Sequence, residues 1–291
     1  MANKYIYSLL GIGFTVCAFA VITANYDKIS RSFSNKDTVP LALMTETARP
    51  IEEESSKTFK NTKEKEAMHT IHDTIQEYKH MSAHSIVDVS QFAKADLKKL
   101  FTVSKISNSI FERMYQKSYK ENCTVPKDSL RYLRVLHMDL DGNTRIGELV
   151  VNESIADDVK TIFYKLYLHG YPIEKMVLVD EYDADDNASM ADNNSSAFNY
   201  RVVEGTTHLS KHSLGLAIDI NPLYNPYIHT LNGQTVCSPE NGSAYSDRTK
   251  DFPYKIDTED YAYKLFLEYG FSWGGSWNSA KDYQHFQIDT E

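Results

Sequence analysis

Cysteine is scarce in this sequence, and none of its three cysteines has the spacing of a metal-binding pair. No CxxC motif is present, so the cysteines are not a metal site. Cys17 lies in an apolar N-terminal run, which leaves Cys123 and Cys237 as the two that an exported protein could join in a disulfide. A metal site in this chain would therefore use histidine and carboxylate ligands.

An excess of basic residues is also lacking. The sequence contains 31 Lys and Arg against 40 Asp and Glu, which gives a net charge of −9. Nucleic-acid binding needs a basic face that neutralises phosphates, so this class of partner is not expected. With 42% hydrophobic and 24% charged residues, the composition is that of a globular protein. A length of 291 residues suffices for one sizeable domain with extensions.

Charged side chains are missing from residues 5–24, and this run is typical of an export signal or a single membrane anchor. A run of about 20 residues is long enough to span a bilayer if it is not removed. Residues 18–20 (AFA) fit a cleavage site, so both outcomes stay open. We assign residues 1–26 to this segment and residues 27–103, which are polar and only partly helical, to a stalk or spacer.

From residue 104 to residue 291 the patterns predict one α+β domain, with a small antiparallel sheet flanked by helices. Residues 130–136 alternate like a strand, and residues 147–151 follow a turn as the returning strand. Residues 155–169 carry apolar side chains at helical spacing. Residues 175–180 are mostly apolar and predict a further strand.

Two common metal motifs are absent. The acidic loop after residue 180 lacks the glycine that a calcium loop requires at its sixth position, so we interpret it as a solvated loop. A helical HExxH motif would place two ligands four residues apart, whereas the first two candidate ligands, His212 and Asp219, are seven apart.

Two short segments in the C-terminal third do supply a ligand set. Asp219 falls on the small and polar face of an alternating stretch that follows His212, and His285 comes three residues after Asp282. A catalytic zinc takes three protein ligands and leaves a fourth position for water, so His212, Asp219 and His285 suffice. Pairing of the two strands would bring Asp219 and His285 together, with Asp282 close enough to take a proton from that water.

These segments resemble the VanY-like D-alanyl-D-alanine carboxypeptidases, which belong to a wider zinc-peptidase group with cell-wall endopeptidases, lysostaphin-like enzymes and the hedgehog signalling domain. The matching motifs are Ser210-x-His212-x-x-Gly215-x-Ala217-x-Asp219 and Asp282-x-x-His285-Phe286. The similarity extends from about residue 104 to the C-terminus.

The resemblance implies roles for several residues. His212, Asp219 and His285 would bind Zn²⁺, and Asp282 would be the general base. Arg201 would steady the substrate carbonyl as it becomes an oxyanion, and Ser210 would help to hold the substrate. Tyr200 and Trp273 are further candidate substrate contacts, although packing in the core is an equal alternative for both.

The sequence therefore predicts an exported, monomeric zinc metallopeptidase that acts on the stem peptide of peptidoglycan. The expected place is the outer face of the cytoplasmic membrane or the cell wall, or the medium after secretion, and the expected bond is the terminal D-Ala-D-Ala bond. Two alternatives remain: an endopeptidase that cuts L-Ala-D-Glu or a cross-bridge, and a non-catalytic wall-binding module.

Overall fold

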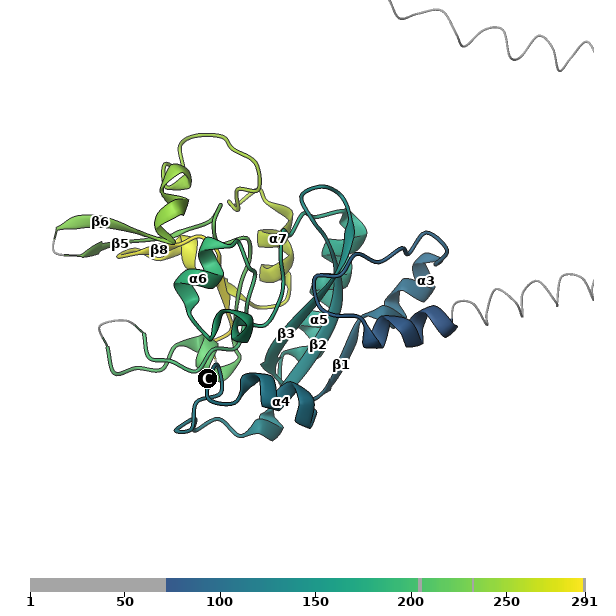
Figure 1. Ribbon diagram of the computed structural model, residues 1–291. Coiled ribbons are helices and arrows are strands. Elements are labelled where there is room, and N and C mark those ends of the chain that lie inside the picture. The colour runs from purple at the N-terminus through teal and green to yellow at the C-terminus, as the bar shows by residue number, and fades with distance from the viewer. Residues whose placement is uncertain (1–71, 204–205, 232, 290–291) are drawn as a thin grey trace, which may run out of the picture. The chain divides into compact units, whose positions relative to one another are not determined.

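The computed structural model describes residues 72–203, 206–231 and 233–289 (Figure 1). The predicted signal or anchor (residues 1–26) and the predicted stalk as far as residue 71 lie outside these residues. Within the described ranges, no helix is both long and apolar enough to cross a membrane. The described chain contains helices and three small antiparallel sheets, in agreement with the predicted α+β class.

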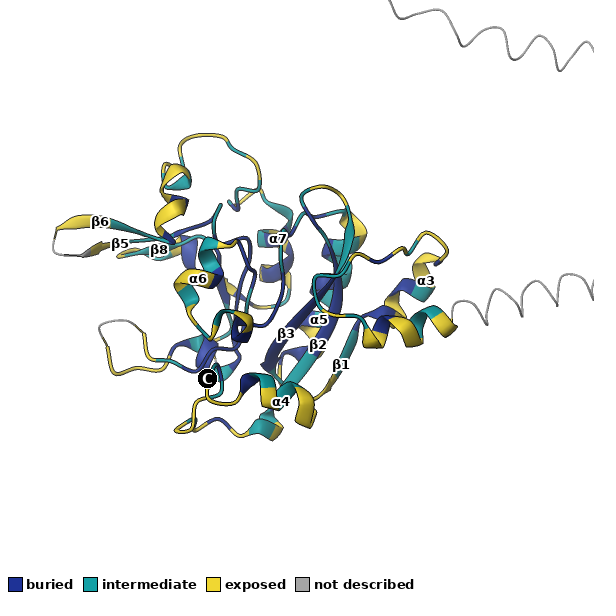
Figure 2. Ribbon diagram, viewed as in Figure 1, coloured by how far each residue is buried: buried dark blue, intermediate teal, exposed yellow. Residues whose placement is uncertain are grey.

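The first sheet consists of β1 (Thr102–Lys105), β2 (Leu130–Met138) and β3 (Thr144–Asn152), in that order. β2 and β3 are the two strands predicted from alternation, and they pair along their full length. Helix α5 (Ala156–His169) follows β3 and contributes its predicted apolar stripe to the same core. Figure 2 shows most of β2 and β3 as buried.

Residues 72–103 belong to the folded unit rather than to a spacer. The predicted boundary at residue 104 falls inside β1, which pairs with β2 from Thr102 onward. Tyr78, Leu100 and Phe101 are buried in the same core as α5, and residues 72–80 and α3 (Lys94–Leu97) are helical. A few apolar side chains, widely spaced in the sequence, are enough to join this segment to the core, and they leave no strong periodic pattern.

The second sheet has the order β4 (Ala217–Asp219), β9 (His285–Gln287) and β7 (Ser272–Trp273). β4 and β9 are antiparallel, with Asp219 directly opposite His285, as the alternation predicted. Ile218 and Phe286 form the apolar face and are completely buried. Phe286 stacks on Phe266 of α7 (Tyr261–Glu268) with ring centroids 4.3 Å apart, so the sheet is held against this helix.

The third sheet has the order β6 (Gln234–Ser238), β5 (Tyr227–Leu231) and β8 (Lys281–Asp282). The β5–β6 hairpin extends away from the rest of the domain (Figure 1). Tyr227 at the base of β5 is paired with Asp282 of β8. This pairing places Asp282 between the hairpin and the second sheet.

The predicted strand at residues 175–180 is wrong. Lys175 makes one isolated bridge, and the segment ends in a 3-10 turn, η3 (Val179–Tyr182). The side chain of Asn194 replaces a strand partner here: its Oδ1 accepts from the Val177 N–H (2.8 Å), and its Nδ2 donates to the Val177 carbonyl (3.0 Å). A side chain thus satisfies backbone groups that would otherwise need a neighbouring strand. Cys123 and Cys237 are free thiols and do not form the disulfide that the sequence left open.

Candidate metal centre

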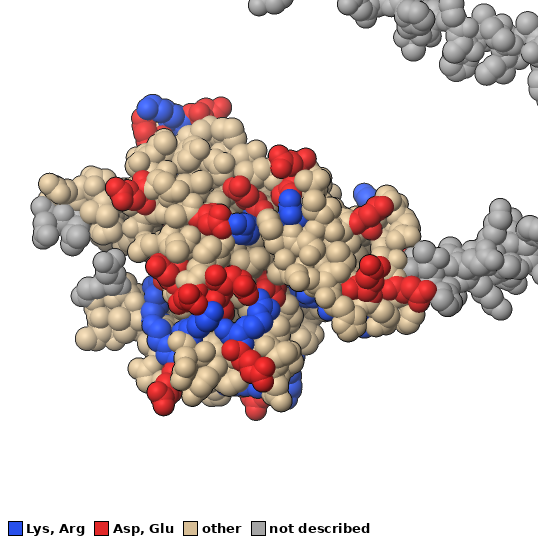
Figure 3. Space-filling view, viewed as in Figure 1, with Lys and Arg blue, Asp and Glu red and all other residues tan. Residues whose placement is uncertain are grey.

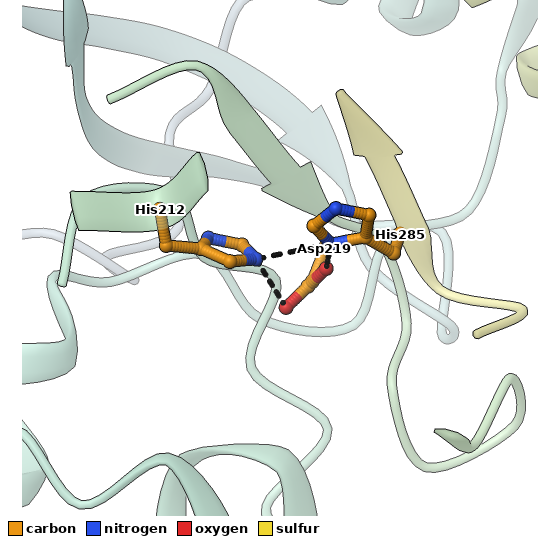
Figure 4. Close-up of side chains that lie close together, drawn as sticks. All are labelled: His212, Asp219 and His285. Carbon is orange, nitrogen blue, oxygen red and sulfur yellow. Dashed lines mark hydrogen bonds and ion pairs between the residues drawn. The ribbon is translucent and has the colours of Figure 1, made fainter. Parts of the chain in front are cut away.

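Two imidazoles and one carboxylate converge between the 3-10 turn η4 (Lys211–Leu214) and strands β4 and β9 (Figure 4). Nε2 of His212 lies 3.1 Å from Nδ1 of His285 and 3.2 Å from Oδ2 of Asp219. Nδ1 of His285 lies 3.0 Å from Oδ1 of Asp219. All three residues are buried, with exposures of 4–7%. The structure thus brings together the three residues that the sequence predicted as metal ligands.

The turn that carries His212 is anchored at both ends. Oγ of Ser210 accepts a hydrogen bond from the His212 N–H (3.3 Å), which caps the start of the turn. Gly215 ends the turn in the left-handed region (φ 68°), and a Cβ there would lie 2.6 Å from the backbone nitrogen of Asn152. The Asn152 N–H donates to the Gly215 carbonyl (2.8 Å), so the turn is fixed against the end of β3. Glycine is required here by both the positive φ and the close approach.

Hydrogen bonds on the far side of each ring decide which nitrogen faces the cluster. Nδ1 of His212 lies 2.5 Å from the carbonyl oxygen of Ala197, which can only accept, so this nitrogen carries the hydrogen. Nε2 of His285 donates to Oε1 of Gln287 (3.0 Å), whose amide is oriented by its own donation to Asp289 (2.9 Å). In the neutral rings, the nitrogens that point at the cluster carboxylate are therefore the unprotonated ones, as metal ligation requires.

These atoms fit a zinc ion. The two imidazole nitrogens and the two oxygens of Asp219 make contacts of 3.0–3.2 Å, and lone-pair-bearing atoms this close repel one another unless a proton or a metal ion lies among them. Zinc bonds of about 2.0–2.1 Å in tetrahedral geometry place neighbouring ligand atoms roughly 3.3 Å apart. The observed separations are close to this value, and two imidazoles with one carboxylate leave a fourth position open, as in catalytic sites.

The charges of the protein groups alone also favour a cation. Burial would raise the pKa of Asp219, but His212 and His285 hold it well below its usual range. Burial would lower the pKa of His285, but its hydrogen bond to Asp219 and the charge of that carboxylate raise it to about 9. The cluster therefore attracts a positive charge, either a proton or a metal ion.

Asp282 lies beside this cluster with a carboxylate oxygen that no described residue engages. Its Oδ1 is buried and has no hydrogen-bond partner in the described part of the chain. Burial raises the pKa of Asp282 to about 6, and the charge of Asp219 adds to the rise, whereas His285 opposes it. The close approach of Gly274 helps to enclose this carboxylate, since a Cβ there would lie 2.8 Å from Cβ of Asp282. A carboxylate with a pKa near neutrality is suited to take up and release a proton.

Arg201 is adjacent to the His212 turn in its backbone, but its side chain is held by another element. Its N–H donates to Oγ of Ser213 (2.7 Å), and its carbonyl accepts from the Ser210 N–H (3.0 Å). The guanidinium forms an ion pair with Asp186, the first residue of α6 (Asp186–Ala191). Asp186 also accepts a hydrogen bond from Nδ2 of Asn199 (2.8 Å). The carboxylate that pairs with Arg201, the predicted oxyanion-stabilising residue, is therefore itself held in place.

The acidic loop before α6 is largely exposed to solvent, and ion pairs link it to neighbouring residues. Lys117 pairs with Asp183 (2.7 Å), and Arg113 pairs with Glu181 (2.8 Å). Oδ1 of Asp185 accepts from two backbone N–H groups at the start of α6. Figure 3 shows acidic and basic side chains adjoining in one patch on the face where Figure 1 labels α6 and α4 (Asn108–Met114). These carboxylates already have protein partners.

The three predicted substrate contacts are buried and have partners within the protein. Ser210 caps the His212 turn, as described above. The hydroxyl of Tyr200 lies 3.1 Å from Oγ1 of Thr124 in a small apolar cluster. Nε1 of Trp273 donates to the Tyr283 carbonyl (2.9 Å). The structure favours the packing alternative for Tyr200 and Trp273.

Two side chains outside the predicted ligand set contact His285. The ring of Trp277, which is half-buried, lies 5.4 Å from the ring of His285, measured between centroids. Gln287 orients His285 through the hydrogen bond described above. The strand alternation already placed Gln287 on the same face as His285, and this was a usable signal. No sequence signal pointed to the Ala197 carbonyl that supports His212, because every residue type has a backbone carbonyl.

Comparison with known proteins bears on the segment that holds the cluster. Residues 204–288 match the family model described as D-alanyl-D-alanine carboxypeptidase. No curated protein and no solved structure gives a significant match to the chain. The matched segment contains His212, Asp219, Asp282 and His285, and it is shorter than the similarity expected from residue 104 onward. The match confirms the resemblance predicted from the sequence: over residues 204–288 the chain is similar to the D-alanyl-D-alanine carboxypeptidase family of peptidases.

Proposed function

We propose that the protein is a zinc-dependent D-alanyl-D-alanine carboxypeptidase that acts on the stem peptide of peptidoglycan. The observation that carries this proposal is the convergence of two imidazole nitrogens and a carboxylate, with the free Oδ1 of Asp282 nearby. The family match supports a peptidase of this type. A wall-binding module without catalysis would not need Asp282 in this position.

The chemistry is amide hydrolysis. Zinc in a site of this kind acidifies water and polarises a carbonyl group. His212, Asp219 and His285 hold the ion, and Ala197 and Gln287 hold the two rings. Asp282 takes the proton from the attacking water and delivers it to the leaving amine nitrogen.

Arg201 contributes by donating to the oxygen of the scissile carbonyl as negative charge develops there. A donor of this kind contributes roughly 3 kcal/mol to transition-state stabilisation. Because Asp186 binds this guanidinium, we propose that Asp186 positions it for that contact.

The Asp186→Asn variant tests this positioning. Without the ion pair, Arg201 samples more orientations, and we expect kcat/KM to fall roughly tenfold, less than the roughly hundredfold loss for Arg201→Ala. The double variant Asp186→Asn/Arg201→Ala should be no slower than Arg201→Ala alone, because both substitutions act on the same contact between Arg201 and the scissile carbonyl. Asp183→Asn, which breaks the neighbouring Lys117 ion pair, is the matched control and should keep its activity. An equal loss from Asp186→Asn in the presence and absence of Arg201 would show that Asp186 acts otherwise.

Mass spectrometry of muropeptides digested by the full-length protein tests the function itself. Loss of one terminal alanine from pentapeptides, abolished by a chelator and restored by zinc, is the expected result. An internal cut would assign the same metal chemistry to an L-Ala-D-Glu or cross-bridge endopeptidase. Bound zinc without any cut would leave the wall-binding module as the function.

We further propose that the protein works outside the cytoplasm as a monomer. The substrate lies there, and the uncharged run at residues 5–24 would serve for export or as an anchor. Fractionation of cells that produce the tagged full-length chain tests the location, since recovery from the cytosol would contradict export, and the mass of the purified protein in solution tests the monomeric state.

A further inference from the structure

A polar cavity lies on the first sheet, and none of the His–Asp–His cluster residues lines it. It has a volume of about 310 Å³ and lies between residues 79–83, the end of β1, helix α4 and the middle of β2 and β3. Four cationic side chains and a single carboxylate line it, on a chain whose net charge is −9. The cavity is thus a local concentration of positive charge.

The floor of this cavity contains charged residues in the middle of largely apolar strands. Arg134 of β2 and Glu148 of β3 are direct cross-strand neighbours, with exposures of only 9% and 1%. Burying a charge costs several kcal/mol unless it is paired and hydrogen-bonded. Glu148 meets this requirement, because it accepts from Arg113 (3.0 Å) and from the Tyr132 hydroxyl (2.6 Å).

Arg134 does not meet this requirement within the described residues. Its Nη2 donates to the carbonyl oxygens of Tyr78 (2.6 Å) and Met81, which are neutral acceptors. Its guanidinium lies over the Tyr78 ring, 4.8 Å from the centroid. Its Nε is buried and has no hydrogen-bond partner among the described residues. The guanidinium of Arg134, a buried cation with an unused donor, therefore forms part of the cavity floor.

The rest of the lining supplies more donors. Lys79 and Lys105 line the cavity, and Nζ of Lys79 donates to Oε1 of Gln76 (3.2 Å). Ser104, Ser107 and Ser109 also line it. Oγ of Ser104 donates to the Tyr132 carbonyl (3.5 Å), and Oγ of Ser107 lies 2.9 Å from Oγ of Ser109. Guanidinium, ammonium and hydroxyl groups around one small volume are the groups that bind a tetrahedral oxyanion.

We propose that this cavity binds a small phosphate-bearing anion. The inference is independent of the peptidase function, because no residue of the His–Asp–His cluster takes part. Phosphate oxygens are distributed around the phosphorus and can accept from floor and walls together, whereas the two oxygens of a carboxylate face one side. The charge of such a ligand also offsets the unpaired cation at Arg134.

Calorimetric titration of the full-length protein with pyrophosphate and inorganic phosphate tests the proposal. The protein is first treated with a chelator, so that no ion at the His–Asp–His cluster can take up the phosphate. The double variant Lys79→Gln/Lys105→Gln removes two exposed cations of the lining, and Ser109→Glu places a carboxylate in the cavity. Lys98→Gln, at an exposed lysine outside the lining, is the control for a lysine substitution elsewhere on the surface.

We expect saturable binding of pyrophosphate to the wild type and to Lys98→Gln, binding weakened roughly tenfold or more in the double variant, and none in Ser109→Glu. Citrate, at the same ionic strength, should bind more weakly than pyrophosphate. Absence of saturable binding, or equal affinity in the wild type and the double variant, would overturn the site. Citrate binding as tight as pyrophosphate would overturn the phosphate class. Thermal unfolding of each variant shows whether it is folded.

Discussion

Replacing His285 with alanine should remove zinc from the protein and abolish hydrolysis with it. His285 supplies one of the three ligand atoms, and its Nδ1 lies within 3.1 Å of both other ligand atoms. The binding free energy of a structural zinc with four ligands is about 10–16 kcal/mol, which is about 3 kcal/mol per ligand. Loss of His285 should therefore lower the zinc affinity more than a hundredfold. Zinc content after dialysis and competition with a chromogenic chelator measure this loss.

His208→Ala is the matched control, because His208 is exposed and only four residues before His212. It should retain zinc and activity. A His285→Ala protein that is folded and still binds zinc with wild-type affinity would remove His285 from the ligand set. Gln287→Ala should give an intermediate result, since loss of a side chain that orients a ligand typically weakens metal binding 10- to 100-fold.

Replacing Asp282 with asparagine should leave zinc in place and remove most of the hydrolysis. The amide keeps the size of the side chain but cannot accept the proton from water, and general-base catalysis typically contributes 10²- to 10⁴-fold. We therefore expect kcat to fall by roughly a thousandfold while zinc content stays at one ion per chain. Single-turnover assays on a purified pentapeptide, together with metal analysis of the same sample, measure both quantities.

Asp251→Asn, which changes an exposed carboxylate, is the control and should behave as the wild type. An Asp282→Asn enzyme with near-normal kcat would exclude Asp282 as the base. A variant that loses zinc as well would instead place Asp282 among the groups that maintain the metal site. Asp282→Ala should give the same outcome as Asp282→Asn, because both variants lack the proton-accepting carboxylate.

Local patterns predicted the elements that carry the cluster, since each one depends on periodicity within a few residues. Alternation around Asp219 and His285 predicted two strands with an apolar face, and β4 and β9 pair in that register. Local patterns failed for residues 175–180. This mostly apolar run predicted a strand, but the side chain of Asn194, instead of a neighbouring strand, bonds to its backbone. Local patterns also failed for residues 72–103, whose few core side chains are too dispersed to form a pattern.

By itself, the sequence determined the candidate chemistry: two histidines and two aspartates in spacings that suit a zinc peptidase, in a chain without cysteine pairs or a basic face. Only the tertiary structure decided how those groups are held. It closed the 66-residue separation between Asp219 and His285, oriented each ring through Ala197 and Gln287, and paired Arg201 with Asp186. It also assembled the cationic cavity from segments between residues 79 and 148. The physical reason is that side-chain type and local periodicity are properties of neighbouring residues, whereas hydrogen-bond partners and cavities arise from contacts between segments far apart in the chain.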